Sequence, residues 1–288
     1  MKNDQLINKK YHILQRKKIL RDKDRFIYNE IANRINQAMV SINFSLNSCL
    51  EIGFSSQKIY KNICAKFQKI NYFAIDILEE ILFDKLTKTS MSFDHDEWHI
   101  FEKKFDLIIS NFYLHLTNNF DILLKNINQS LNCNGFFIAT LPSLNCFKEI
   151  KNCMILADIE TYGGAYKRFG NLYSIEIINQ IMKKHDFKIP VIEKDILELR
   201  YKKFSSLLKD VRNLGNSYMY LDRKKTFENK KYFKKIEDIY WNRYSNNNQL
   251  ILSLEIIFIS GWKKDSSQQK PLKPGSAKIS LQKALKEI

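Results

Sequence analysis

The chain has 288 residues, of which 44% are hydrophobic and 13% aromatic, so it can bury one large core or two small ones and is not a disordered chain. Its longest apolar run, residues 250–262, is interrupted by Glu255 and is shorter than the roughly 18–20 residues that a membrane helix needs. Residues 1–18 are charged throughout and lack the apolar core of a secretory signal. These features predict a cytoplasmic protein with no transmembrane segment and leave peripheral membrane contact open.

The formal net charge of +16 raises the question of a nucleic-acid partner. The lysines are spread along the chain, however, and only residues 223–235 are markedly dense in them. There they alternate with Phe227, Tyr232 and Phe233, a pattern typical of an amphipathic helix docked on a sheet. A solvated helix face is therefore favoured over a phosphate-binding patch, and we expect no nucleic acid to bind.

Cysteine and histidine spacing indicates neither a disulfide framework nor a metal. The five cysteines form no CxxC pair, and their odd number without a secretory signal indicates reduced structural thiols. The five histidines fall in no HExxH or comparable ligand spacing. We therefore expect no metal site.

The first 45 residues are expected to form an N-terminal helical segment. From residue 16 to 45, apolar side chains recur at helical spacing: Ile19, Phe26, Ile27, Ile31, Ile35 and Met39. Strand-like and helix-like segments then alternate. Strands are expected at 48–53, 71–76, 90–94, 104–110 and 134–142, and helices at 56–68, 77–86 and 119–131. This alternation predicts an α/β protein with a doubly wound, mostly parallel sheet and helices on both faces.

After Pro142 the alternation becomes less regular. Helices are expected at 143–164, ending at Gly163-Gly164, and at 174–187, with Ser174 as N-cap. Residues 188–201 are expected to be extended, about 203–244 to be a helical insertion, and 250–263 to be the last strand. The predicted organisation is a helical segment at 1–45, one domain at 46–262 and a polar tail at 263–288.

Acidic residues at the ends of the first strands are the first candidates for a ligand site, because ligands of such sheets bind outside the carboxyl ends of the strands. The first strand ends in Glu51 and Gly53. The second ends in Asp76, 23 residues after Gly53, near the spacing at which an acid meets ribose hydroxyls. Asp96 and Glu97 follow the third strand, where a carboxylate can accept from an adenine amino group.

Each of these acids also has a structural interpretation. An acid after a strand is commonly a helix N-cap, which is the alternative for Asp76. Asp96 and Glu97 lie in an acidic run, 94–97, that is also typical of a solvated loop. Beyond the fourth strand, His115 is a candidate general base, although a packed or solvent-facing histidine is favoured there.

The ordered set of motifs resembles the class I S-adenosylmethionine-dependent methyltransferases from about residue 24 to 262. The segment LEIG at 50–53 resembles their glycine loop, and FDLIISN at 105–111 and LNCNGFFIATLP at 131–142 resemble their fourth and fifth strands. The resemblance implies a Rossmann-like sheet of seven strands. It also implies S-adenosyl-L-methionine as cofactor, with Glu51, Gly53, Asp76, Asp96, Glu97 and Asn111 as cofactor-binding residues.

Later segments narrow the resemblance to one subgroup. Residues 157–195, 200–217 and 256–277 are similar to alphaproteobacterial and mitochondrial proteins related to complex I assembly factor 5, and distantly to the malonyl carrier protein methyltransferase of the biotin pathway. For the mitochondrial members this implies hydroxylation of an arginine on a complex I subunit. Bacterial members are described as methyltransferases.

The resemblance implies a methyltransferase acting on a protein, in the assembly of respiratory complex I, with arginine hydroxylation left open. Methyl transfer requires alignment rather than a protein nucleophile, which agrees with the lack of a triad. Tyr113 and His115 are the candidate catalytic residues, and Tyr162 and Arg168 the candidate acceptor-binding residues.

Two alternatives stay open. An RNA methyltransferase agrees with the charge, but SNFY at 110–113 lacks the two prolines of the amino-methyltransferase tetrapeptide. A non-catalytic assembly factor agrees with the glycine-poor loop, in which Gln57 replaces a second glycine. We expect Gln57 to limit cofactor binding, because a side chain there narrows the loop and glycine reaches angles that glutamine does not.

Overall fold

The structure is a computed structural model, and it describes residues 7–21, 25–40, 46–54, 57–67, 69–78, 89–92, 103–170, 172–214, 218–221, 223–224, 226–266 and 268. Three sequence predictions lie outside these ranges: the site residues Asp96 and Glu97, the expected helix from residue 79 onward, and the tail from residue 269 onward.

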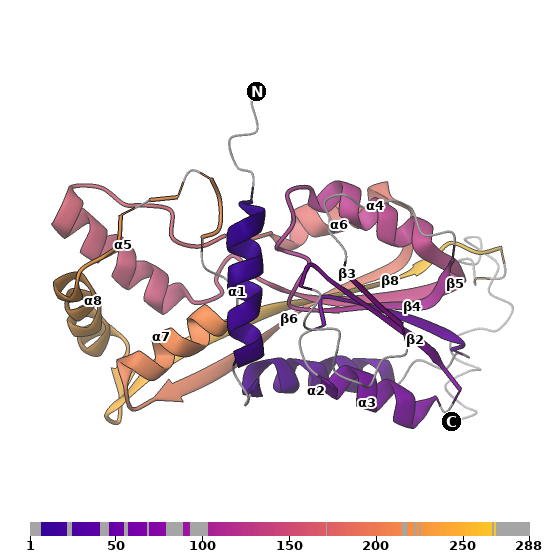
Figure 1. Cartoon of the computed structure of the whole chain (residues 1–288), viewed down its shortest axis with the longest axis horizontal. Coiled ribbons are helices and arrows are strands. Elements are labelled where there is room, and N and C mark those ends of the chain that lie inside the picture. Colours follow the sequence, from indigo (N-terminus) through magenta and orange to yellow (C-terminus); the bar gives the residue numbers. More distant parts are fainter. Residues whose placement is uncertain are drawn as a thin grey trace, which may run out of the picture.

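One mixed sheet organises the chain (Figure 1). Its strand order is β3 (Thr89–Ser92), β2 (Asn71–Asp76), β1 (Ser48–Ile52), β4 (Phe105–Asn111), β5 (Leu131–Pro142), β8 (Gln249–Lys263) and β6 (Phe187–Tyr201). The first five strands are parallel, β8 is antiparallel to both neighbours, and the short β7 (Ser245–Asn246) pairs with β8. The predicted doubly wound, mostly parallel sheet of seven strands is confirmed, with β7 as an addition.

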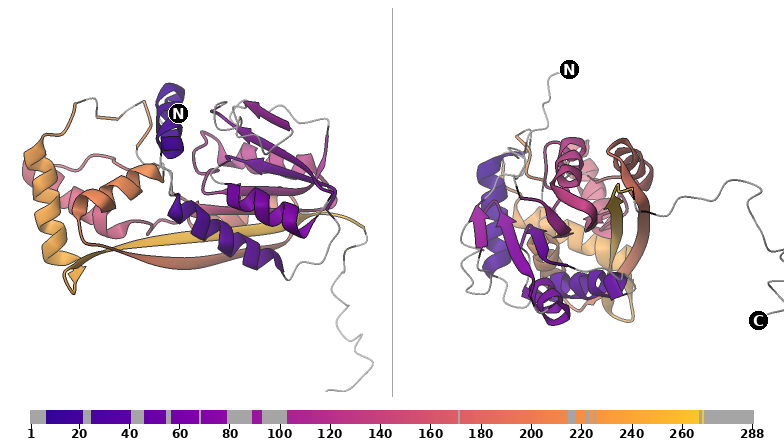
Figure 2. Two further views of the ribbon diagram at one scale, coloured as in Figure 1. Left: turned by 60° about the horizontal axis from the view of Figure 1, so that its bottom comes forward. Right: turned by 90° about the vertical axis from the view of Figure 1, so that its right-hand side faces the viewer.

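The central strands are apolar on both faces because helices cover both sides. All five residues of β1 are buried, as are six of the seven in the pattern of β4. On one face lie α2 (Phe26–Val40) and α3 (Gln57–Lys66), and on the other α4 (Phe120–Ser130) and α6 (Ile175–Lys184), as Figures 1 and 2 show. As predicted, Ser174 caps α6, since its hydroxyl accepts from the backbone N–H of Ile177 at 3.3 Å.

The N-terminal segment forms two helices, α1 (Lys9–Arg21) and α2. In α2, Ile27, Ile31, Ile35 and Met39 are buried as predicted, but Phe26 is 55% exposed, so its expected place in the core is wrong. Helix α1 differs in kind, because it buries the polar residues His12, Gln15 and Arg16.

A helical lobe stands on an extension of the sheet. The pairing of β5 with β8 ends at Pro142 and Ile256, whereas β6 and β8 stay paired as far as Tyr201 and Leu250. On this projecting ribbon lie α5 (Lys148–Tyr162), α7 (Phe204–Asn213) and α8 (Lys230–Arg243), at the left of Figure 1. Helix α5 ends at Gly163, which has a φ of 73°, as the Gly-Gly pair predicts.

The expected docking of residues 223–235 on the sheet is wrong. Helix α8 begins only at Lys230, capped by Asn229, and packs mainly against α5. Phe227 precedes the helix and is fully exposed, while Tyr232 is buried. None of the helices in the described ranges is long and apolar enough to cross a membrane.

Candidate functional site

The carboxyl ends of β1, β2 and β4 bring predicted site residues together, among them Gly53, Asp76 and Tyr113. Ile52 pairs with Ile75 on one side and Ser110 on the other, so the residues that follow these strands share one edge of the sheet. Gly53 donates its N–H to the carbonyl of Ile75 at 2.8 Å and has a φ of 77°. A Cβ on Gly53 would lie 2.0 Å from Cγ of Tyr113, so only glycine fits here.

Asp76, the predicted ribose ligand, is 1% exposed and already has three donors. Its Oδ1 accepts from the backbone N–H of Leu78 at 3.0 Å and from Nε of Arg16 at 3.3 Å, and its Oδ2 accepts from Nη2 of Arg16. The bond to Leu78 is the kind a helix N-cap makes, so both interpretations of Asp76 find support in its position.

Arg16 reaches this edge from α1, and it is 1% exposed. Its Nη2 also donates to the carbonyl of Phe54 at 3.2 Å, and its guanidinium lies 4.8 Å from the ring centre of Tyr113. Burial lowers the pKa of Arg16, but the carboxylate of Asp76 together with the hydroxyls of Tyr113 and Tyr28 more than offsets this, and the pKa is raised. The arginine is therefore charged inside the protein and depends on Asp76 for its counter-ion.

Buried side-chain atoms of α1 and β1 that have no hydrogen-bond partner in the described part of the chain include Oε1 of Gln15, Nη1 of Arg16 and Oε1 of Glu51. Buried polar atoms are normally satisfied, so each of these atoms is a candidate partner for a polar ligand or a water molecule. Sequence analysis missed Arg16 and Gln15; the only available signal is that α1 lacks an apolar stripe.

Glu51 does not face solvent. It is fully buried, and Tyr72 donates its hydroxyl to Oε2 of Glu51 at 2.6 Å. Burial raises the pKa of Glu51 to about 8, against the opposing effect of the Tyr72 hydrogen bond. The carboxyl is therefore mostly protonated near neutral pH.

The segment after β4 fills the space above Gly53. The hydroxyl of Tyr113, a residue that is 1% exposed, accepts from the backbone N–H of Ile77 at 3.4 Å, so this side chain reaches from Gly53 to the end of β2. His115 is 2% exposed and lies edge-on to Phe112, with ring centres 5.3 Å apart. The structure thus places His115 as a packed histidine, one of the two alternatives favoured from the sequence.

Asn111 is also buried, but its amide connects structural elements. Its Nδ2 donates to the carbonyl of Tyr28 in α2 at 3.0 Å, and its Oδ1 accepts from the hydroxyl of Thr140 in β5 at 3.4 Å. A role in cofactor binding stays a prediction and would have to share these bonds.

The predicted acceptor residues Tyr162 and Arg168 lie in the helical lobe, apart from Asp76. Arg168 donates to Asp158 from both Nε, at 2.8 Å, and Nη2. Its Nη2 also donates to Glu228, at 2.8 Å. Tyr162 donates to Glu228, and Tyr232 donates to Asp158 at 2.7 Å. The arginine is thus held by two carboxylates.

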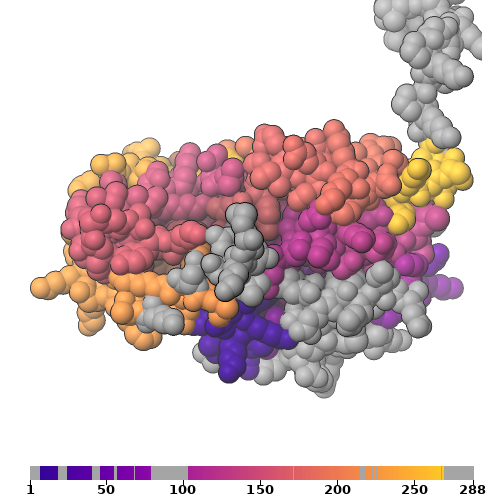
Figure 3. All heavy atoms as spheres, turned by 90° about the horizontal axis from the view of Figure 1, so that it is seen from above, coloured from indigo at the N-terminus to yellow at the C-terminus, as the bar shows by residue number. Residues whose placement is uncertain are grey.

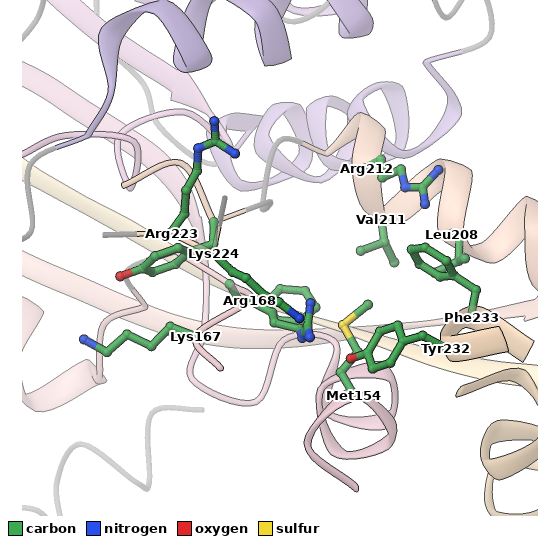
Figure 4. A pocket seen from close by; sticks show the side chains of 12 residues that line it. Met154, Lys167, Arg168, Leu208, Val211, Arg212, Arg223, Lys224, Tyr232 and Phe233 are labelled. Atoms are coloured by element: carbon green, nitrogen blue, oxygen red, sulfur yellow. The ribbon is translucent and has the colours of Figure 1, made fainter. Parts of the chain in front are cut away.

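A cavity of about 220 Å³ opens beside this network (Figure 4). Its cationic lining residues are Lys167, Arg168, Arg212, Arg223 and Lys224, and its walls include Met154, Tyr232 and Phe233. In Figure 4 the Arg168 and Lys224 side chains extend toward Met154 and Tyr232, whereas Lys167 points away. Glu228 pairs with Lys224 as well as Arg168, so positive charge remains in excess at the cavity.

Helix α1 lies between the two sites. Figure 3 shows it between the orange part of the helical lobe and the magenta part of the sheet domain. Arg16 of this helix contacts Asp76. Tyr11 of the same helix contacts Arg223, whose guanidinium lies 3.8 Å from the centre of the Tyr11 ring. One short helix thus connects the strand edge with the cationic cavity.

The chain matches the methyltransferase-domain family over residues 23–190, more than half of its length. It belongs to that family. The sheet order and the residues at the strand edge agree with a class I methyltransferase, for which S-adenosylmethionine is the expected cofactor. Among the described residues, no group of three or more His, Cys, Asp or Glu side chains is arranged to hold a metal ion.

Individual relatives support the subgroup prediction. The mitochondrial arginine-hydroxylase NDUFAF5 of Dictyostelium discoideum is 28% identical over 276 residues, which are 88% of this chain and 63% of that protein. The malonyl-acyl-carrier-protein O-methyltransferase of Legionella pneumophila is 19% identical over 244 residues, 82% of this chain and 84% of the relative. This chain therefore spans less than two thirds of the Dictyostelium protein.

A solved structure supports the fold. Protein BH2331 of Bacillus halodurans superposes with a TM-score of 0.55 at 9% identity, covering 81% of this chain and 98% of that one. At this identity the likeness concerns the fold alone.

The residues at the strand edge fit S-adenosylmethionine. Gly53 leaves no side chain between β1 and a ligand, and Asp76 stands where a ribose acid is expected. The unsatisfied atoms of Gln15 and Arg16 add a polar acceptor and a donor. Tyr113 and Arg16 occupy part of the same edge, so cofactor binding requires both side chains to shift.

Proposed function

We propose that this chain is an S-adenosylmethionine-dependent enzyme of the methyltransferase type that acts on a protein. The observation that carries the proposal is Asp76 at the end of β2, beside the side-chain-free Gly53, in the strand order of a class I methyltransferase. When bound, the cofactor supplies the sulfonium-linked methyl group, and the protein supplies position.

Each residue of the strand edge has a defined task in this proposal. Asp76 accepts the two ribose hydroxyls, because a carboxylate has lone pairs for both. Gly53 lets the backbone approach the ligand. Asp96 and Glu97 remain the proposed adenine-side residues. Tyr113 now lies over Gly53, and after its ring has moved aside it is the proposed wall that separates cofactor from acceptor.

We further propose that the acceptor belongs to respiratory complex I assembly, because the resemblance to the subgroup of complex I assembly factor 5 implies it and the arginine-hydroxylase NDUFAF5 is among the relatives. The excess positive charge at the cavity of the helical lobe favours an acidic part of the acceptor there and repels a guanidinium. An arginine acceptor would therefore reach the strand edge by another approach. The cytoplasm remains the proposed compartment.

Calorimetry with S-adenosylhomocysteine tests the cofactor assignment. Asp76→Asn is expected to weaken binding by about tenfold or more, since it removes charge-assisted hydrogen bonds. Asp186→Asn is the matched control, because Asp186 is an aspartate with a side chain 72% exposed. An absence of binding to the wild-type chain, or equal affinities for wild type and Asp76→Asn, would contradict the assignment.

The acceptor chemistry needs a separate measurement. Complex I subunits incubated with the chain are examined by mass spectrometry for added mass. A shift by one methyl group indicates methylation, and a shift by one oxygen atom indicates hydroxylation. If neither shift occurs on any subunit while cofactor binding is intact, the complex I proposal is wrong.

A further inference from the structure

Arg16 and a ribose compete for the same carboxylate. Asp76 accepts from Leu78 and twice from Arg16, so it cannot accept two ribose hydroxyls while keeping all of these bonds. Arg16 is fully buried, and a buried guanidinium that loses its carboxylate carries a large penalty. Cofactor binding at Asp76 therefore takes at least one hydrogen bond from Arg16, and a second anion beside the guanidinium would replace it.

The cofactor brings one such anion, the carboxylate of its amino-acid end. Arg16 already extends toward the loop after β1, because its Nη2 donates to the carbonyl of Phe54. Its Nη1 has no hydrogen-bond partner among the described residues, so the guanidinium has a donor to spare. Guanidinium groups bind carboxylates in a two-pronged geometry that a neutral donor does not reproduce.

We infer that Arg16 is a cofactor-binding residue that holds Asp76 in the cofactor-free chain and pairs with the amino-acid carboxylate of the cofactor once the ribose takes Asp76. This inference rests on the proposed function. It gives α1 a task in ligand recognition, since the helix supplies a charged partner for the amino-acid carboxylate of the cofactor. It also explains why a charged side chain is buried on a helix without an apolar stripe.

The test compares two ligands that differ at the amino-acid end. S-adenosylhomocysteine carries the carboxylate, whereas methylthioadenosine has the same nucleoside and thioether sulfur without it. Dissociation constants of both are measured by calorimetry on the full chain, for wild type and Arg16→Gln. We expect the preference of the wild type for S-adenosylhomocysteine to fall by about tenfold or more in Arg16→Gln, the factor that a charge-assisted pair provides.

Two further variants guard against a folding defect. Arg16→Lys keeps a positive charge opposite Asp76 but loses the two-pronged geometry, so it should fold and show a smaller loss of preference. Arg34→Gln is the matched control, because Arg34 on α2 pairs with Glu30 and Asp195 away from the strand edge. Its preference should equal that of the wild type.

The outcomes separate the inference from the proposed function. If both ligands bind Arg16→Gln more tightly by the same factor, Arg16 only blocks Asp76 and the inference is wrong. An unchanged preference in both Arg16 variants also overturns it, while the proposed function stands as long as S-adenosylhomocysteine binds. If neither ligand binds any of these chains, both fail.

Discussion

Two arginines, one in each part of the molecule, are held by carboxylates in different ways. Arg168 in the helical lobe donates to Asp158 and Glu228, and both acids have additional tyrosine donors. Arg16 at the strand edge has Asp76 as its one carboxylate among the described residues and leaves Nη1 unsatisfied.

This difference distinguishes a structural network from an exchangeable pair. The carboxylates around Arg168 also accept hydrogen bonds from Tyr162, Lys224 and Tyr232, so removing the arginine leaves both acids with other donors. In the Arg16–Asp76 pair the two charges balance, but Nη1 of Arg16 makes no hydrogen bond within the described residues. Asp76 also lies at the strand end where sheets of this kind bind a ribose. A ligand that satisfies both members can separate them.

Breaking the strand-edge pair should have the largest effect. Asp76→Ala leaves Arg16 buried without a counter-ion, and we expect the free energy of unfolding to fall by about 3–5 kcal/mol in denaturant titrations. Adding Arg16→Met should restore most of this loss, because neither charge then remains buried. A double variant no more stable than Asp76→Ala would show that the pair is not the cause.

Breaking the other network should cost less and leave the cofactor unaffected. Arg168→Ala removes charge-assisted hydrogen bonds from two acids, one of them reached by solvent, and we expect a loss of about 2 kcal/mol in the same titrations. The affinity for S-adenosylhomocysteine should stay within about twofold. A loss of affinity as large as that of Asp76→Asn would contradict the separation of the two regions.

A third buried group, Glu51, predicts that the stability of the strand edge depends on pH. Because burial raises its pKa to about 8, the folded chain keeps a proton that the unfolded chain releases above its ordinary pKa of 4.5. Its contribution to stability is complete below that pH and is lost as pH rises through 8. Denaturant titrations at pH 5 and pH 8 should show that the stability of Glu51→Gln relative to wild type rises by on the order of 3 kcal/mol between the two pH values. Equal differences at both pH values would argue against a protonated Glu51.

Gln57 bears on the room available at the strand edge. It is the first residue of α3 and has ordinary helical backbone, so the expected strain at this position is absent. The expected competition for space remains, and Gln57→Gly should tighten S-adenosylhomocysteine binding by roughly threefold. Lys58→Gly, one residue further along α3, serves as control. Weaker binding by Gln57→Gly alone would mean that the glutamine contacts the cofactor.

The lysines of α8 should not bind nucleic acid. Lys234 pairs with Asp238 at 3.1 Å and Lys235 with Glu160 at 3.2 Å, which reduces the charge that a phosphate backbone would meet. Filter binding should therefore show no submicromolar, salt-dependent RNA affinity. Such an affinity, lost when these lysines become glutamine, would restore the RNA methyltransferase alternative.

The sheet domain could be predicted because its signals are local. Residues 71–76 form β2 at the predicted bounds, and apolar runs also located β1, which ends beside Glu51 and Gly53, and β4. The pairing of Arg16 with Asp76 spans 60 residues and joins a polar helix to a strand end, so no periodicity could predict it. In α8, the amphipathic pattern identified Tyr232 as an apolar position that is buried, but it included Phe227, which is fully exposed, and did not predict that α5 would cover the helix.

A crystal structure of the chain with S-adenosylhomocysteine tests the central claim most directly. The account predicts Asp76 hydrogen-bonded to both ribose hydroxyls, Arg16 separated from Asp76 and paired with the ligand carboxylate, and the Tyr113 ring displaced from above Gly53. A ligand bound elsewhere, with the Arg16–Asp76 pair intact, would contradict it.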